Sequence, residues 1–393
     1  MRNRLSVLVL PLCFNVIAVW ANAQVSAPAA DSHPFATKFQ PYLAAHTMAG
    51  AVFLVATKDK ILDEETVGFA DVETQKPMSP DNEFAIASMT KPMTGVALMM
   101  LVDEGKVSID DPVEKYLPEF KGQTVKGPNG TLVPPTHPIL IREILSHTSG
   151  LPNVPDRVTE PIAKRTETFG KTPLDFQPGT KFVYVNAGID TAARIIEVVS
   201  GEPYEKFLQE HLLTPLGMSD TTFWPDAGQL TRLVSFYKAT PDNKGLAKQV
   251  SPNVPIPGKP RIYPLAAGGL SSTAADLLKF CRMMLQGGVY EGKRYISEDS
   301  LAAMTKTHTT QATGGSYGLT WMINPKGFFH NGAFKTHMGI MPHEGLVEIF
   351  LVQQEGAWPN GATGKNDLVN VFSQTVEDVF GKSQTTASTA PTP

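Results

Sequence analysis

Apolar residues alternate with polar ones, or form short continuous runs, in the two end regions of the chain. Residues 50–72, GAVFLVATKDKILDEETVGFADV, predict two strands joined by a polar turn. Near the C-terminus, three runs predict an antiparallel meander: YGLTWMINP, GFFHNGAFKTHMGIMP and GLVEIFLVQQ. Strands at both ends of the chain therefore predict one sheet built from its N- and C-terminal parts.

Between these regions the apolar residues follow a helical period. The clearest run is FAIASMTKPMTGVALMMLVDEG, residues 84–105, in which Gly105 marks the expected helix end. Further helices are predicted in ILIREILSHTSGLPN, YVNAGIDTAARIIEVVSG, EPYEKFLQEHLLTPLGM, TAADLLKFCRMMLQGG and KNDLVNVFSQTVEDVF, and loops in 121–138 and 243–264. The predicted fold class is α+β: an antiparallel sheet flanked by helices, with an inserted, mainly helical lobe. We expect a cleft between the lobes, at the start of the 84–105 helix.

Both ends of the chain are predicted to lie outside the folded domain. MRNRLSVLVLPLCFNVIAVWANAQ has two arginines, an apolar run and small residues, which predict a signal peptide (1–23) cleaved after Ala23. The alternative is a membrane anchor, but the run is shorter than the ~20 residues of a span and contains Pro11 and Asn15. A linker (24–34), one domain (35–380) and a disordered tail (381–393) follow. Within the domain we expect a sheet lobe at about 35–90 and 262–380 and a helical lobe at about 91–261.

Composition narrows the class of protein. The chain has 393 residues, of which 42% are hydrophobic and 18% charged, as in an ordinary globular enzyme. Its net charge of −4, which becomes −6 when Arg2 and Arg4 leave with the signal peptide, offers no basic surface for nucleic acid. Cys281 is then the only cysteine, so no internal disulfide forms, although the signal peptide predicts a periplasmic or secreted protein.

The first candidate for chemistry is Ser88, which precedes Lys91 by three residues at the start of the 84–105 helix. On a helix this spacing puts the two side chains next to each other. A lysine desolvated against the apolar helix could accept the serine proton, and the first N–H groups of the helix could stabilise an oxyanion. The alternative is a helix-capping serine beside a solvated lysine. A second S-x-x-K, Ser235–Lys238, has no apolar helix behind it, so we interpret it as coincidental.

Two further groups of residues carry reactive or polar side chains. In KFVYVNAG, Tyr184 and Asn186 precede a predicted helix, where they could face one pocket; alternatively the tyrosine is a core residue and the asparagine a helix cap. In FFHNGAF, His330 lies beside Gly332, and a glycine within a strand often marks close approach of a backbone or ligand. A histidine there could bind a substrate oxygen or transfer protons, although a single histidine on a strand is more often structural.

In chain order, these three groups resemble the motifs of the serine β-lactamase and penicillin-binding-protein superfamily, in the branch similar to class C β-lactamases. Relatives in this branch include family VIII carboxylesterases, D-aminopeptidases and D-alanyl-D-alanine carboxypeptidases. Residues 88–91 fit S-x-x-K, residues 184–186 fit Y-x-N, and residues 330–332 occupy the place of K-T-G. The similarity extends over roughly residues 35–380 through LSHTSGLP, FQPGTKFVYVNAG, TPLGMSDT, AAGGLSSTAADLLKF and YGLTW.

The resemblance implies a β-lactamase/transpeptidase-like fold and a serine hydrolase that works through a covalent acyl-enzyme, without metal or cofactor. The roles it implies are a nucleophile (Ser88), proton transfer (Lys91 and Tyr184), substrate orientation (Asn186 and His330), an oxyanion hole (the N–H groups of Ser88 and Ala333), and a close strand approach allowed by Gly332. One departure stands out: His330 replaces the lysine that usually holds a substrate carboxylate. A histidine is mostly neutral at pH 7, which disfavours strong β-lactam turnover and leaves esters and small amides open.

Other functional classes fit less well. The chain has no G-x-S-x-G motif of an α/β-hydrolase and no H-E-x-x-H motif of a zinc enzyme. We expect a small ester, amide or peptide as substrate, a class that includes D-amino-acid peptides, and no nucleic-acid partner. A β-lactamase, a D-Ala-D-Ala carboxypeptidase, or a sensor that is acylated without turnover are the alternatives.

Overall fold

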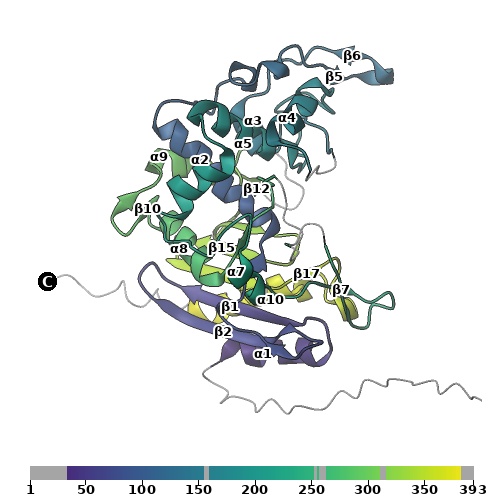
Figure 1. Cartoon of the computed structure of the whole chain (residues 1–393), viewed down its shortest axis with the longest axis vertical. Helices are drawn as coiled ribbons and strands as arrows, with labels where there is room; N and C mark the ends of the chain where they lie inside the picture. The colour runs from purple at the N-terminus through teal and green to yellow at the C-terminus, as the bar shows by residue number, and fades with distance from the viewer. Residues whose placement is uncertain (1–32, 155–158, 252–254, 256–262, 310–315, 382–393) are drawn as a thin grey trace, which may run out of the picture.

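An eight-stranded antiparallel sheet dominates the computed structural model, which describes residues 33–154, 159–251, 255, 263–309 and 316–381 (Figure 1). The strand order is β12-β13-β14-β15-β16-β1-β2-β3. The bounds are Ser316–Tyr317 (β12), Met322–Asn324 (β13), Gly327–Asn331 (β14), His337–Met341 (β15), Leu346–Leu351 (β16), Gly50–Ala56 (β1), Ile61–Asp71 (β2) and Lys76–Pro77 (β3). Because β16 from the C-terminal part pairs with β1 from the N-terminal part, the prediction of one shared sheet is confirmed.

The two faces of the sheet are covered by helices from different parts of the chain. Side chains alternate along β1, so that Phe53 faces one core while Val52 and Leu54 face the other. The Phe53 side packs against α1 (Pro34–Ala44) and α10 (Leu368–Val376), where Phe53 stacks on Phe350 with ring centroids 5.2 Å apart. The opposite face packs against α8 (Ala274–Leu285). The α+β class with an antiparallel sheet flanked by helices is therefore confirmed.

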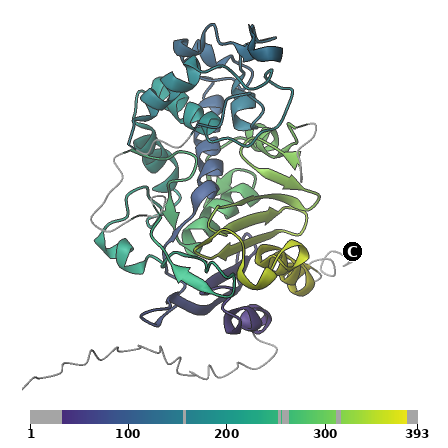
Figure 2. The same cartoon turned by 90° about the vertical axis from the view of Figure 1, so that its right-hand side faces the viewer.

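The helical part lies at the end of the long axis opposite to α1 (Figure 1), and Figure 2 shows it on one side with the sheet on the other. Its central helix is α2 (Thr90–Asp103), which is almost entirely buried and packs against α5 (Ala187–Ser200) and α9 (Glu298–Thr305). The other segments are α3 (Ile141–Leu145), α4 (Ile162–Lys171), α6 (Tyr204–Phe207) and the π-helical η5 (Leu208–Leu213). The short α7 (Ala227–Arg232) lies apart from them, and the residue after it, Leu233, pairs with Glu83. The predicted lobe boundaries stay a prediction.

Two local expectations differ from the structure. The helix predicted in ILIREILSHTSGLPN is only five residues long, because His147 (φ 59°) and Gly150 (φ 79°) turn the backbone out of the helical region. The predicted loop 121–138 contains a small hairpin of β5 (Val125–Lys126) and β6 (Leu132–Val133). The predicted signal peptide, most of the linker and tail, and much of 243–264 lie outside the described residues.

Three further groups of short strands lie outside the main sheet. β4 (Phe84–Ala85) pairs with β9 (Ser271–Ser272), which brings the segment before α2 against the segment before α8. A separate sheet joins β17 (Gln354–Glu355), β7 (Tyr237–Ala239) and β8 (Leu246–Lys248). The hairpin of β10 (Val289–Tyr290) and β11 (Lys293–Arg294) follows α8. No helix in the described part of the chain is long and apolar enough to cross a membrane.

Candidate active site

Ser88 lies between a short strand and a long buried helix. β4 leads into a 3₁₀ turn (Ala87–Met89), and α2 begins at the next residue. The turn starts with Ala87 at φ 45°, a left-handed conformation that is costly for a residue with a Cβ. The N–H group of Ile86 donates to the Leu270 carbonyl (3.0 Å), which fixes the chain just before the half-buried Ser88.

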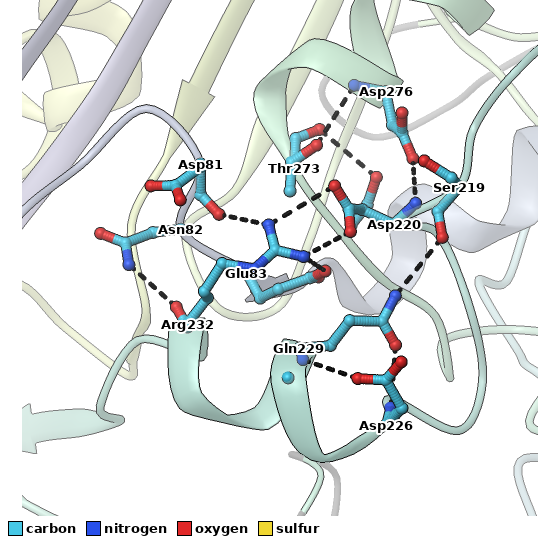
Figure 3. A network of polar contacts seen from close by, with 12 residues as sticks. Asp81, Asn82, Glu83, Ser219, Asp220, Asp226, Gln229, Arg232, Thr273 and Asp276 are labelled. Atoms are coloured by element: carbon cyan, nitrogen blue, oxygen red, sulfur yellow. Dashed lines mark hydrogen bonds and ion pairs between the residues drawn. The ribbon is translucent and has the colours of Figure 1, made fainter.

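A polar network holds the residues that precede β4 (Figure 3). The Arg232 guanidinium donates to the Asp81 carbonyl (2.8 Å) and forms an ion pair with Asp220. The N–H of Glu83 donates to the Arg232 carbonyl (3.0 Å), and the Glu83 carboxyl lies 3.5 Å from the guanidinium. Burial, together with the nearby charge of Asp220, raises the pKa of Glu83 to about 8. Glu83, five residues before Ser88, therefore contacts Arg232 through both its backbone and its side chain.

Lys91 is completely buried and points at Ser88. Its Nζ lies 3.0 Å from Ser88 Oγ and donates to the Ala267 carbonyl at 2.8 Å. The same loop is fastened to α2 by Thr94 Oγ1, which donates to the Ala266 carbonyl at 2.8 Å. The structure thus differs from the alternative of a solvated lysine. Nor does Ser88 act as the N-cap of α2, because Met89 occupies that position.

Tyr184 and Asn186 lie just before α5, and Tyr184 contacts the lysine. Tyr184 is 36% exposed, and Lys91 Nζ lies 4.8 Å from the centroid of its ring. Asn186 is the N-cap residue of α5, but its side chain makes no capping hydrogen bond. The capping role considered as the alternative for this asparagine is therefore not what the structure shows.

Two aromatic residues that we did not single out from the sequence complete the surroundings of Tyr184. The ring centroids of His147 and Tyr317 lie 4.3 Å and 6.2 Å from that of Tyr184, and 4.9 Å from each other. Phe182 packs against Tyr317 at 5.5 Å. His147 and Tyr317 occur in LSHTSGLP and YGLTW, the phrases that carried the family resemblance. That resemblance was the available signal, because nothing in the local pattern assigns them a role.

His330, on β14, is fully buried rather than open to solvent. Its Nδ1 lies 2.8 Å from the Asn331 carbonyl, which only accepts, so Nδ1 donates. Its Nε2 is then the acceptor for the Tyr317 hydroxyl at 3.1 Å. Burial lowers the pKa of His330 to about 3, so the imidazole is neutral. Both ring nitrogens are thus used within the protein, which differs from the expected orientation toward a cleft.

Gly332 and Ala333 form the turn between β14 and β15. The N–H of Gly332 donates to the Thr336 carbonyl (2.7 Å), and Thr336 Oγ1 donates to the Ile86 carbonyl (3.2 Å). A Cβ on Gly332 would lie only 2.5 Å from the same Ile86 oxygen. Glycine therefore permits this turn to approach the backbone two residues before Ser88, and the exposed Ala333 follows directly.

Hydrogen bonds between buried polar side chains connect this turn to α10. His337 on β15 pairs with Asn331, and its Nδ1 lies 2.6 Å from Asn331 Oδ1. Its Nε2 lies 2.9 Å from the Glu348 carboxylate, which also accepts from the Ser373 hydroxyl at 2.8 Å. The chain links the third motif to α10. Among the described residues, no group of three or more His, Cys, Asp or Glu side chains is placed to hold a metal ion.

The mixed fold with its antiparallel sheet, together with the Ser–Lys pair, defines a class: serine hydrolases of the β-lactamase/transpeptidase fold. The chain belongs to the Beta-lactamase family, whose model matches residues 35–368. Protein Rv1367c of Mycobacterium tuberculosis is 34% identical over 78% of this chain and 86% of that protein. The D-alanyl-D-alanine-carboxypeptidase/endopeptidase AmpH of Escherichia coli is 28% identical over 75% and 77%, and the esterase EstB of Burkholderia gladioli 27% over 73% and 85%.

Solved structures share the fold at lower identity. EstCE1, a hydrolase with promiscuous acyltransferase activity, is 21% identical with a TM-score of 0.68, over 87% of this chain and 96% of that chain. A class C β-lactamase from Rhodobacter sphaeroides is 19% identical with a TM-score of 0.69, over 88% and 99%. The family and fold implied by the sequence are therefore confirmed, with esterases and carboxypeptidases among the relatives.

Proposed function

We propose that this protein is an exported serine hydrolase that acts on esters or small amides through a covalent acyl-enzyme at Ser88. The observation that carries the proposal is the buried Lys91 Nζ, 3.0 Å from Ser88 Oγ and 4.8 Å from the Tyr184 ring. A serine becomes a nucleophile when a base within hydrogen-bond distance accepts its proton. Lys91 is in turn oriented by the Ala267 carbonyl, so the pair is held in place before substrate arrives.

The geometry supports a two-step reaction. Ser88 Oγ attacks the substrate carbonyl carbon while its proton passes to Lys91, and the N–H groups of Ser88 and Ala333 stabilise the oxyanion. Collapse of this intermediate breaks the bond to the leaving group, which takes up a proton by way of Tyr184. Water then attacks the acyl-enzyme carbonyl carbon and passes a proton by way of Tyr184 to the neutral amine of Lys91. The bond to Ser88 Oγ breaks, Lys91 returns that proton to Oγ, and the acid leaves. Asn186 orients the substrate from the start of α5.

The third motif favours uncharged substrates. His330 is neutral and bonded to Tyr317, so it supplies no cation for a substrate carboxylate. We therefore assign His330 an indirect role, in which it fixes the Tyr317 hydroxyl beside the site. The aromatic side chains of Phe182 and Tyr317 favour an apolar acyl group. The similarity to the esterase EstB agrees with this preference.

A peptidase is the second candidate, and the similarity to AmpH favours it. Such an enzyme, like a β-lactamase, needs a group that binds the carboxylate of its substrate. Export is part of the proposal as well, because the first 23 residues have the pattern of a signal peptide. Mass spectrometry of the protein recovered outside the cytoplasm would then find Gln24 as the first residue.

The test compares initial rates of the mature protein and Ser88→Ala on a short-chain nitrophenyl ester and a chromogenic cephalosporin. We expect ester hydrolysis that falls at least about 1,000-fold in Ser88→Ala, with little cephalosporin hydrolysis in either protein. Fast cephalosporin turnover would instead favour the β-lactamase alternative and overturn the role given to His330. A stoichiometric burst without turnover would indicate an acylated sensor. Equal rates in both proteins would remove Ser88 from the mechanism.

A further inference from the structure

His147 holds the chain on both sides of Tyr184. Its carbonyl accepts from the N–H of Val183 at 2.9 Å, and its Nδ1 accepts from the N–H of Val185 at 3.3 Å. These two valines are the immediate neighbours of Tyr184 along the chain. One residue, 37 positions upstream, therefore anchors the backbone on either side of the tyrosine.

The His147 ring also contacts the Tyr184 ring directly. Their centroids are 4.3 Å apart with 38° between the planes, and Tyr317 closes the other side of the imidazole at 4.9 Å. His147 is only 1% exposed, so rotation of the imidazole would displace packed neighbours. Its position therefore limits where the Tyr184 ring can lie relative to Lys91.

The chemistry of this contact requires a neutral imidazole. Since Val185 N–H donates to Nδ1, the ring proton resides on Nε2, for which the described residues provide no hydrogen-bond partner. Burial lowers the pKa of His147 well below its usual value, so Nδ1 remains an acceptor. The residue sits at φ 59°, and its neighbour Thr148 donates its N–H to the Glu143 carbonyl at 2.9 Å. This turn directs both acceptors of His147 toward residues 183–185.

We infer that His147 is a positioning residue for Tyr184: it fixes the tyrosine against Lys91 for proton transfer through its Nδ1 acceptor and its ring. The inference rests on the proposed function, because it concerns the acyl-enzyme reaction at Ser88. Without the acceptor, the N–H of Val185 is left unpaired in a buried place and residues 183–185 shift. A displacement of about 1 Å in a catalytic group can cost about 100-fold in rate.

The experiment uses His147→Phe, which keeps an aromatic ring but removes the acceptor, and His147→Asn, whose Oδ1 can take the place of Nδ1. Asparagine also tolerates the left-handed backbone. We expect His147→Phe to lower kcat for the nitrophenyl ester about 100-fold, with KM changed less than about threefold, and His147→Asn to recover at least about 10-fold of the loss. The matched control is His46→Phe, an exposed histidine at φ 52° between α1 and β1, which we expect to leave both constants unchanged.

Several results would overturn the inference. One is a kcat for His147→Phe close to that of the wild type. Another is a kcat for His147→Asn as low as that of His147→Phe when both variants are folded by circular dichroism. If His147→Phe does not fold, His147→Asn is compared with His147→Gln, whose longer side chain places its oxygen elsewhere, and equal kcat values reject the inference. Activity retained by Ser88→Ala would reject the proposed function instead, whatever the His147 variants do.

Discussion

The chain contains the tetrapeptide pattern S-x-x-K twice, and the two copies have different surroundings. Ser88 and Lys91 lie at the start of a buried helix with 3.0 Å between Oγ and Nζ. Ser235 precedes β7, and its hydroxyl donates to Asp71 at 2.6 Å. Lys238 lies on β7, is 48% exposed, and pairs with Glu355 at 2.7 Å.

The difference shows that the S-x-x-K spacing brings the serine and the lysine together only when both lie on a helix. On a helix, residues three apart share a face, whereas along a strand they point to opposite faces. In the second copy, the serine and the lysine therefore each find a separate carboxylate. In the first copy, the contacts of Lys91 with the described residues are Ser88, the Ala267 carbonyl and the Tyr184 ring, so its amine is directed at a hydroxyl instead of a carboxylate.

The carboxyl groups near the two copies have pKa values that are shifted in opposite directions. Hydrogen bonds from Lys248, Ser235 and Thr74 outweigh partial burial and hold the pKa of Asp71 well below its usual value. Glu83, close to the first copy, is fully buried, and desolvation raises its pKa to about 8. The second copy is thus part of a surface ion-pair network, and the first lies in a region that disfavours charge.

The largest difference is expected between the two lysines, because only the Lys91 amine contacts a candidate nucleophile. Lys91→Met should lower kcat for ester hydrolysis by about 100- to 10,000-fold, because a positioned base contributes that much. Lys238→Met, with the same change in a half-exposed ion pair, should leave kcat within about twofold. Steady-state kinetics on the nitrophenyl ester measure both. Comparable losses in the two variants would contradict the distinction between the copies.

A methyl group at Gly332 should be the next most damaging change. In Gly332→Ala the added carbon would meet the Ile86 carbonyl oxygen at 2.5 Å, so the turn and the segment before Ser88 must separate. We expect kcat to fall about 100-fold as the oxyanion donors move apart. Gly245→Ala is the matched control near the second copy, because its added carbon meets nothing within 4 Å. Unchanged turnover in Gly332→Ala would show that Ala333 N–H does not act there.

The buried carboxyl of Glu83 should make stability depend on pH. Its folded pKa, about 8, lies above its value of 4.5 in the unfolded chain. Its contribution to the free energy of unfolding is therefore full below about pH 4.5 and is lost as the pH rises through about 8. In Glu83→Gln this part of the decrease, a few kcal/mol, should disappear. Urea unfolding between pH 5 and 9 measures it, with Glu298→Gln, whose side chain is 81% exposed, as the control.

Parallel pH curves for the wild type and Glu83→Gln would contradict the assignment of this carboxyl as protonated at neutral pH. The control Glu298→Gln should follow the wild type throughout, since an exposed carboxyl has nearly the same environment in the folded and unfolded chains.

The smallest effect is expected at Ser235, where the serine is structural. Ser235→Ala removes a hydrogen bond to the ionised Asp71 and should lower the free energy of unfolding by about 1–2 kcal/mol, with unchanged ester hydrolysis. Ser88→Ala should do the reverse, with stability within about 0.5 kcal/mol of the wild type and ester hydrolysis at least about 1,000-fold slower. Urea unfolding and ester kinetics on the two variants provide the full comparison. Loss of activity in Ser235→Ala would contradict the assignment of Ser235 as a purely structural residue.

Much of the fold could be predicted from local patterns. Residues 50–72 alternate or run apolar because β1 is buried on both faces and β2 on part of its length, and these patterns depend only on neighbours in the chain. Gly201, at φ 75°, ends α5 where the sequence predicted it. The helix predicted in ILIREILSHTSGLPN is present as α3 but ends early, at Leu145, because His147 adopts a left-handed backbone and bonds to residues 183 and 185, far along the chain.

The sequence by itself determined the sheet, the main helices, and the candidate residues at 88, 91, 184, 186 and 330–333. The tertiary structure decided what surrounds them: Ala267 on Lys91, His147 on Tyr184, and Tyr317 on His330. These partners lie between 13 and 176 positions apart along the chain. Desolvation and the choice of hydrogen-bond partner depend on which distant segments meet. Those contacts form only when the strands have paired and the helices have packed against one another.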